Sequence, residues 1–251
     1  MKLPGNLHLD FIAATLEGFE ENIIYSLLDR VQYCTNTVIY KEGKSGFAGE
    51  LNKSLFSIRL RSQEEMDARF GRFFVAEERP FTRRLPRSRR TTRPAKTGLA
   101  ITDFNLINLT PEILDSYLKL VSRMCRRGDD RHYGSSVEHD VSALQAISRR
   151  IHYGAMYVAE SKYRSNPVQW EDLIKAHDAA GLLTLLTRKK VEERIINRIR
   201  QKVVFIQKHV NLKVRCKIDP DTVVRYYRDT IIPLTKQGEI MYLLKRDSRK
   251  P

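Results

Sequence analysis

The longest helical pattern of apolar residues runs from Tyr133 to Lys162. Apolar side chains recur there at three- and four-residue steps, at Val137, Val141, Leu144, Ile147, Ile151 and Val158. This period lays one apolar stripe along a helix, so we predict a single long helix packed against a core. Ser135 or Ser136 is expected to cap its start. Glu138 is expected in the first turn, where the helix dipole favours an acid.

Three polar residues, Arg149, Arg150 and His152, interrupt this stripe. One interpretation is an ordinary solvated face of the helix, and the other is a pair of cations directed into a site. Periodicity alone leaves both open, because it counts apolar positions and says nothing of what a buried cation would bind.

The other periodic segments also predict helices. In chain order they cover residues 10–33, 54–74, 110–124, 170–176, 179–186, 190–210 and 219–246. Thr110 followed by Pro111 is typical of an N-cap and first-turn proline, and Asp219 followed by Pro220 also marks a helix start. Pro233 should kink the last helix. No strand pattern of comparable length appears, so we predict an all-α bundle, with residues 1–251 forming one domain.

Two segments lack periodicity and predict loops, residues 36–49 and 79–98. The second contains eight basic residues and no acid up to position 96: Arg79, Arg83, Arg84, Arg87, Arg89, Arg90, Arg93 and Lys96. The formal net charge of +15 suggests a nucleic-acid partner. About half of that excess lies in this one loop and the rest of the chain is mixed in sign, so we expect no nucleic-acid partner. Deletion of residues 83–93 should leave folding nearly unchanged.

Cysteine spacing and hydropathy indicate which cellular compartment and which cofactors the protein can have. Cys34, Cys125 and Cys216 lie far apart, with neither CxxC nor Cys/His spacing, so they predict no zinc site and no disulfide framework. The first 21 residues lack the features of a signal or transit peptide, and no apolar run is long enough to span a membrane. We expect a cytoplasmic protein with reduced thiols, no metal and no membrane partner.

Several segments together resemble one family. The run GSSVEHDVSALQAISRRIHYGAMYVAESK resembles the long central helix of the all-helical chorismate mutases, of the larger regulated kind found in fungi and plants. KKVEERIINRI and YYRDTIIPLTKQGEIMYLLKR resemble, in the right order, the helices that close the family's active site. The resemblance covers most of the chain but is poor between Thr82 and Asn108. It implies a homodimer that converts chorismate to prephenate for phenylalanine and tyrosine synthesis, without a cofactor.

The resemblance also implies roles for individual residues. Arg150 would bind a substrate carboxylate, and Lys162 would reach the ether oxygen and a carboxylate. Glu192 would hold the substrate hydroxyl, Thr235 would help to hold a carboxylate, and Glu239 would face the ether oxygen. The chemistry fits these residue types, because the planar fork of arginine matches a carboxylate and the rearrangement itself needs no nucleophile.

Three departures from the family pattern concern the same site. Ala13 replaces an arginine of the family's first helix, and Arg188 replaces an asparagine. We predict that Arg188 serves as the second carboxylate anchor, although it could equally point to solvent. The interval from Arg150 to Lys162 is one residue longer than usual, which would rotate Lys162 away from Arg150 unless a π-bulge near residues 153–156 absorbs the extra residue.

The family's effector site, which binds aromatic amino acids at the dimer interface, is also altered. Its arginine pair corresponds here to Gly71 and Arg72, the loop before the central helix keeps Gly134 and Ser135, and Glu138 stands where a threonine is usual. A missing guanidinium and an added carboxylate predict weak effector binding. Two alternatives to an active mutase therefore stay open, a catalytically impaired member of the family and a basic nucleic-acid-binding protein.

Overall fold

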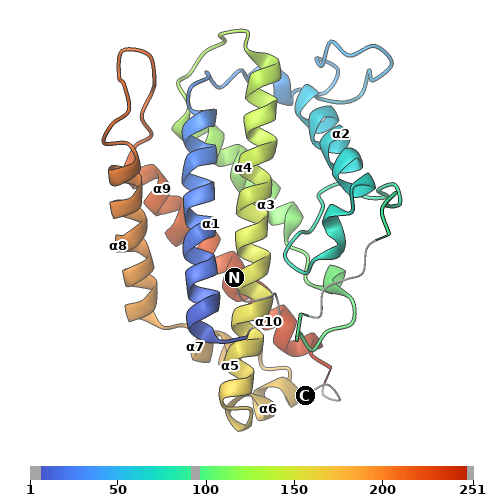
Figure 1. The fold of residues 1–251 in the computed structure, drawn as a ribbon, viewed down its shortest axis with the longest axis vertical. Helices are drawn as coiled ribbons and strands as arrows, with labels where there is room; N and C mark the ends of the chain where they lie inside the picture. Colours follow the sequence, from blue (N-terminus) through green and yellow to red (C-terminus); the bar gives the residue numbers. More distant parts are fainter. Residues whose placement is uncertain (1–6, 92–96, 248–251) are drawn as a thin grey trace.

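The computed structural model describes residues 7–91 and 97–247, and this part of the chain consists of helices joined by loops, with no strand (Figure 1). Its α-helices are α1 (Leu9–Arg30), α2 (Leu55–Arg69), α3 (Thr110–Met124), α4 (Tyr133–Tyr153), α5 (Ala159–Ser165), α6 (Val168–Lys175), α7 (Ala179–Leu186), α8 (Lys189–Ile206), α9 (Pro220–Tyr226) and α10 (Ile232–Lys245). The all-α prediction is confirmed. None of these helices has the length and apolar character needed to cross a membrane.

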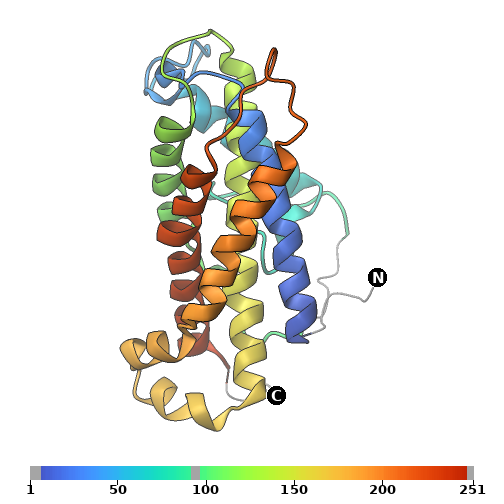
Figure 2. The same cartoon turned by 90° about the vertical axis from the view of Figure 1, so that its left-hand side faces the viewer.

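The predicted central helix forms the axis of the molecule. It consists of α4, a π-helical turn η4 (Gly154–Val158) and α5. α1 packs along α4, α10 packs against η4, and α8 lies beside α1 (Figures 1 and 2). Five apolar residues of the predicted stripe, Val137, Val141, Leu144, Ile147 and Ile151, are at most 2% exposed. The π-bulge inferred from the spacing of Arg150 and Lys162 is therefore present, at residues 154–158.

The start of the central helix differs from its prediction. α4 begins at Tyr133 with His132 at the N-cap position, so neither Ser135 nor Ser136 is the cap, and the first turn contains no acid. Ser136 is fully buried, and its hydroxyl accepts a hydrogen bond from Asn36 Nδ2 at 2.9 Å. A tertiary contact has taken the hydroxyl that local capping would use.

Other helix ends also shift. α2 stops at Arg69 instead of Phe74, because Gly71 has a φ of +82° and ends the helix, and a short 3₁₀ turn η2 (Arg72–Phe74) follows. α3 begins as predicted around Thr110, but Leu109 is its N-cap. α8 ends at Ile206 instead of 210. The predicted loop at 36–49 contains a 3₁₀ turn η1 (Thr37–Tyr40).

The last helix is interrupted just before Pro233. A π-helical turn η5 (Tyr227–Ile231) separates α9 from α10. Proline has no N–H to donate to the carbonyl four residues earlier, so the hydrogen-bond ladder must rearrange at this point. The predicted disturbance is present and takes the form of this π turn.

The basic segment is a loop over residues 79–91, and its remaining predicted basic positions, Arg93 and Lys96, lie outside the described residues. Arg79 does not belong to an exposed run, since it is 5% exposed. Its guanidinium donates to the Val75 carbonyl at 2.6 Å and to Asn105 Oδ1 at 2.9 Å. The loop is therefore anchored at its start, which the charge pattern could not indicate.

Candidate active site

A cleft of about 350 Å³ lies between α1, the central helix, α8 and α10. All six residues predicted to contact substrate line it: Arg150, Lys162, Arg188, Glu192, Thr235 and Glu239. They come from segments separated by up to 89 positions in the sequence, and the fold brings them together around one cleft. All six therefore line the same cleft, and the roles that the resemblance implies for them stay predictions.

Arg150 is held rigidly at the inner wall of the cleft. It is only 3% exposed, so the solvated-face interpretation is wrong for this residue. Its Nη1 donates to Thr235 Oγ1 at 2.8 Å, and that hydroxyl donates in turn to the Ile231 carbonyl at 2.7 Å. The buried Nε of Arg150 has no hydrogen-bond partner among the described residues. A buried cation with an unused donor is suited to bind an anionic group of a ligand.

Lys162 and Glu239 form a second polar pair. Lys162 Nζ lies 2.9 Å from Glu239 Oε2, and their side chains are 14% and 5% exposed. Burial raises the pKa of Glu239 above the ordinary glutamate value, and the nearby charges of Lys162, Arg150 and Lys236 oppose that rise only partly. The pair thus combines a cation with a carboxyl group that burial favours in its neutral, hydrogen-bond-donating form.

The cleft also contains charged residues that sequence reasoning missed. Lys236 Nζ donates to Glu192 Oε1 at 2.9 Å, and Arg198 donates to both carboxylate oxygens of the fully buried Glu20 at 2.7 and 2.9 Å. Arg194 lines the same space. Lys236 follows Thr235 directly, but adjacent helix residues point about 100° apart, so the sequence offered no signal for its place in the cleft.

On α1, the position where the family has an arginine is Ala13, which lines the cleft and supplies no charge. Arg188 lies across the cleft at the N-cap position of α8 and is exposed. Its side chain has no hydrogen-bond or ion-pair partner within the described part of the chain, in contrast to Lys162, Lys236 and Arg198. A cation without a protein partner is available to a ligand.

His152, the third polar residue of the apolar stripe, has a structural role. It is fully buried, and its Nε2 accepts a hydrogen bond from the Leu109 N–H at 3.0 Å, at the start of α3. Its Nδ1 lies 2.8 Å from the Ser148 carbonyl. Burial lowers the pKa of His152 to about 4, so it is neutral and can accept this hydrogen bond at neutral pH.

Comparison with known proteins identifies the family. No family model matches the chain. The chain is 36% identical over 249 residues to chorismate mutase 2 of Petunia hybrida, covering 96% of this chain and 93% of the relative. It is 35% identical to chorismate mutase of Schizosaccharomyces pombe, covering 96% of both chains. The chain belongs to the chorismate mutases of the fungal and plant type. The crystal structure of Aro7p chorismate mutase from Candida albicans, in complex with L-Trp, superposes with a TM-score of 0.87 at 31% identity, covering 96% of this chain and 92% of that one.

The residues that correspond to the effector site of chorismate mutases do not meet within one chain. Arg72 Nη1 binds Asp67 at 2.5 Å and Gln145 at 2.7 Å, so its guanidinium is already engaged. Gly134 and Ser135 lie at least ten residues nearer the start of α4 than Gln145, a separation of about 15 Å along the helix.

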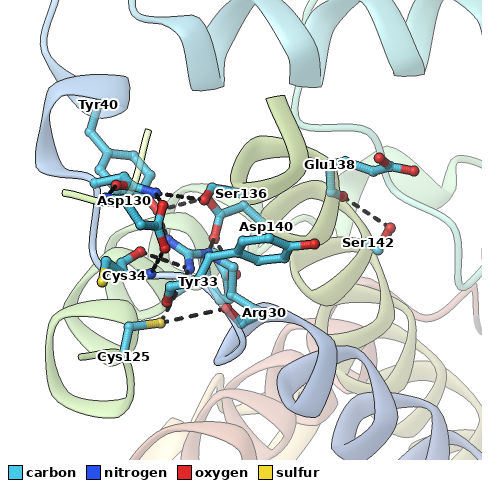
Figure 3. Close-up of polar contacts among 12 residues, drawn as sticks. Arg30, Tyr33, Cys34, Tyr40, Cys125, Asp130, Ser136, Glu138, Asp140 and Ser142 are labelled. Carbon is cyan, nitrogen blue, oxygen red and sulfur yellow. Dashed lines mark hydrogen bonds and ion pairs between the residues drawn. The ribbon is translucent and has the colours of Figure 1, made fainter. Parts of the chain in front are cut away.

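A buried polar network lies next to the N-terminal part of α4, which contains Gly134 and Ser135 (Figure 3). Arg30 Nε donates to Asp140 Oδ1 at 2.6 Å, and the Tyr40 hydroxyl donates to Asp140 Oδ2 at 2.6 Å. Both side chains of the ion pair are fully buried. Glu138 is exposed, and its carboxylate points away from this network. These contacts hold the end of α1 and the turn η1 against α4 at Asp140, and they use neither Gly134 nor Ser135.

Proposed function

We propose that the cleft converts chorismate to prephenate, a step of phenylalanine and tyrosine synthesis. The observation that carries the proposal is the placement of two polar pairs, Arg150 with Thr235 and Lys162 with Glu239, in one cleft of about 350 Å³. The family membership supports the substrate class. The substrate brings two carboxylates, a hydroxyl and an enol ether, and the cleft offers a partner for each.

The reaction is an intramolecular rearrangement in which the ether C–O bond breaks while a C–C bond forms. The protein must hold the compact reactive conformer and stabilise negative charge that develops on the ether oxygen. Arg150 and Thr235 hold one carboxylate. Lys162 and the neutral form of Glu239 donate hydrogen bonds to the ether oxygen, and Glu192 holds the hydroxyl. No covalent intermediate and no cofactor enters this scheme.

Arg188 is the proposed anchor for the second carboxylate. Ala13 cannot supply a charge, and Arg188 lines the same cleft with a guanidinium that no residue of 7–91 or 97–247 pairs with. Its position at the N-cap of α8 also places it one turn before Glu192, which is expected to bind the substrate hydroxyl. Ala13→Arg should partly restore the activity lost in Arg188→Ala, because it returns a cation to the opposite wall of the cleft. An unchanged rate in that double variant would contradict this part of the proposal.

The proposal is tested by mixing purified protein with chorismate and following the loss of its absorbance. We expect a rate orders of magnitude above the uncatalysed reaction. A rate equal to the uncatalysed one would favour the impaired family member, which Ala13 motivates. Tight, sequence-selective binding of DNA or RNA at physiological salt would instead favour the nucleic-acid-binding alternative, which the exposed arginines of residues 83–90 motivate.

We further propose that the protein is a cytoplasmic homodimer. Met66 of α2 and Phe70, the C-cap residue of α2, lie one turn apart and are 45% and 68% exposed, an apolar surface that a second copy would cover. The three cysteines are free thiols, as a reducing compartment allows. Light scattering should give twice the chain mass, and Phe70→Glu should shift it to the monomer. Cell fractionation tests the compartment.

A further inference from the structure

The π-helical turn η4 lies between Arg150 and Lys162 and determines their relative orientation. An α-helix turns about 100° per residue, so the twelve steps from Arg150 to Lys162 would leave the two side chains about 120° apart. Both nevertheless line the same cleft. A π turn accommodates one additional residue, which reduces the angle to about 20°. The register of the two cations thus depends on η4.

η4 packs closely against α10, and a glycine lies on each side of the contact. A Cβ atom built on Gly154 would lie 2.7 Å from Thr235 Cγ2 and 3.6 Å from Arg150 Nη1. A Cβ built on Gly238 of α10 would lie 2.5 Å from the Cβ of Ala155. Both of the shortest distances are well inside van der Waals contact, so each glycine allows a close approach that alanine would prevent.

The atom that a side chain at position 154 would clash with belongs to Thr235, a residue of the site. Thr235 carries both the Cγ2 methyl that faces Gly154 and the Oγ1 hydroxyl that accepts the hydrogen bond from Arg150. Thr235 is 7% exposed, and its hydroxyl is also bonded to the Ile231 carbonyl, so it has little freedom to move aside. A side chain at position 154 would therefore push the hydroxyl away from Arg150.

We propose that Gly154 is a positioning residue for the rearrangement. Because Gly154 has no side chain, η4 can approach α10 closely enough for Thr235 to accept the hydrogen bond from Arg150. The close packing thereby sets the position of this carboxylate-binding pair relative to Lys162, which follows the π turn. The inference rests on the proposed function, because it assigns Gly154 to the reaction of that same cleft.

A double-mutant cycle tests the proposal with kcat and KM for chorismate as readouts. Gly154→Ala is expected to lower kcat/KM about 10-fold or more, since small misplacements of binding groups can cost about 100-fold. Thr235→Ser removes the Cγ2 methyl and keeps the hydroxyl. In the Gly154→Ala background it should restore kcat/KM to within about threefold of Thr235→Ser alone. Because the same clash could also destabilise the fold, kcat is referred to the folded fraction measured by circular dichroism, and a loss of kcat/KM that follows only the folded fraction would contradict a positioning role.

Gly18→Ala is the matched control, because a Cβ built on Gly18 in α1 meets no atom within 4 Å. It should retain parental kinetics. If Gly154→Ala folds poorly, the double variant carries the test, and its failure to fold and turn over would overturn the proposal. The proposal would also be overturned if the fold-losses of kcat/KM in Gly154→Ala and Thr235→Ser multiplied in the double variant. A Gly154→Ala enzyme as active as the parent would overturn it too. An inactive parent would contradict the proposed function itself, a result distinct from these.

Discussion

Glu239→Gln should abolish the loss of activity at rising pH. Glu239 is 4% exposed, and burial raises its pKa. The neutral acid can donate a hydrogen bond to the ether oxygen, whereas the carboxylate would repel the charge developing there and would retain Lys162 in an ion pair. The active form is therefore the protonated one, and activity is full below the folded-state pKa and falls as pH rises through it.

The size of the effect follows from the proton equilibrium. Above its pKa, the protonated fraction of Glu239 falls about tenfold per pH unit, equivalent to about 1.4 kcal/mol of transition-state stabilisation per unit. Glutamine keeps an N–H donor at every pH, so the profile of kcat against pH should become flat over the range where the parent declines. Glu192→Gln is the matched control, because it should lower the rate and keep the decline. A decline in Glu239→Gln equal to that of the parent would refute the reasoning.

Four further results are expected. Arg188→Ala should lower kcat/KM about 10-fold or more, and the neighbouring Lys189→Ala, outside the cleft, should not; equal kinetics of the two variants would place Arg188 in solvent. Asp140→Ala should lower the free energy of unfolding in urea by about 3–5 kcal/mol, because it leaves a fully buried guanidinium unpaired. Deleting residues 83–93 should change that free energy by about 1 kcal/mol at most and leave turnover nearly unchanged, and any binding of polyanions by the intact chain should be weak and salt-sensitive. Tyrosine or tryptophan should change kcat/KM less than about fivefold, since Arg72 is already bound by Asp67 and Gln145.

The sequence predicted those features that depend on local periodicity. The stripe from Val137 to Ile151 is part of the core of the fold, because a helix must bury its one apolar face. The interval from Arg150 to Lys162, one residue longer than in the resembled family, indicated a π turn only on the condition that both residues share one site, and the structure contains that turn at residues 154–158. Helix ends were less accurate. Ser136 bonds to Asn36, far away in the chain, instead of capping α4, and local signals contain no information on such partners.

The charged pairs of the cleft could not be read from the sequence for a related reason. Lys236 and Glu192 are 44 positions apart, and Arg198 and Glu20 are 178 positions apart. Their pairing depends on how α8 packs against α10 and α1, which hydrophobic periodicity does not specify. The partner of Arg150, Thr235, also comes from another helix, so the sequence could not show why an arginine interrupts the apolar stripe.

The central claim is that this cleft catalyses the rearrangement of chorismate through Arg150. The most direct test is the rate of prephenate formation by the parent protein and by Arg150→Ala, measured side by side with product identified by mass. We expect catalysis by the parent and a loss of about 100-fold or more in kcat/KM for the variant, because a buried charged contact to a carboxylate is removed. A parent without catalysis, or a variant equal to an active parent, would contradict the account.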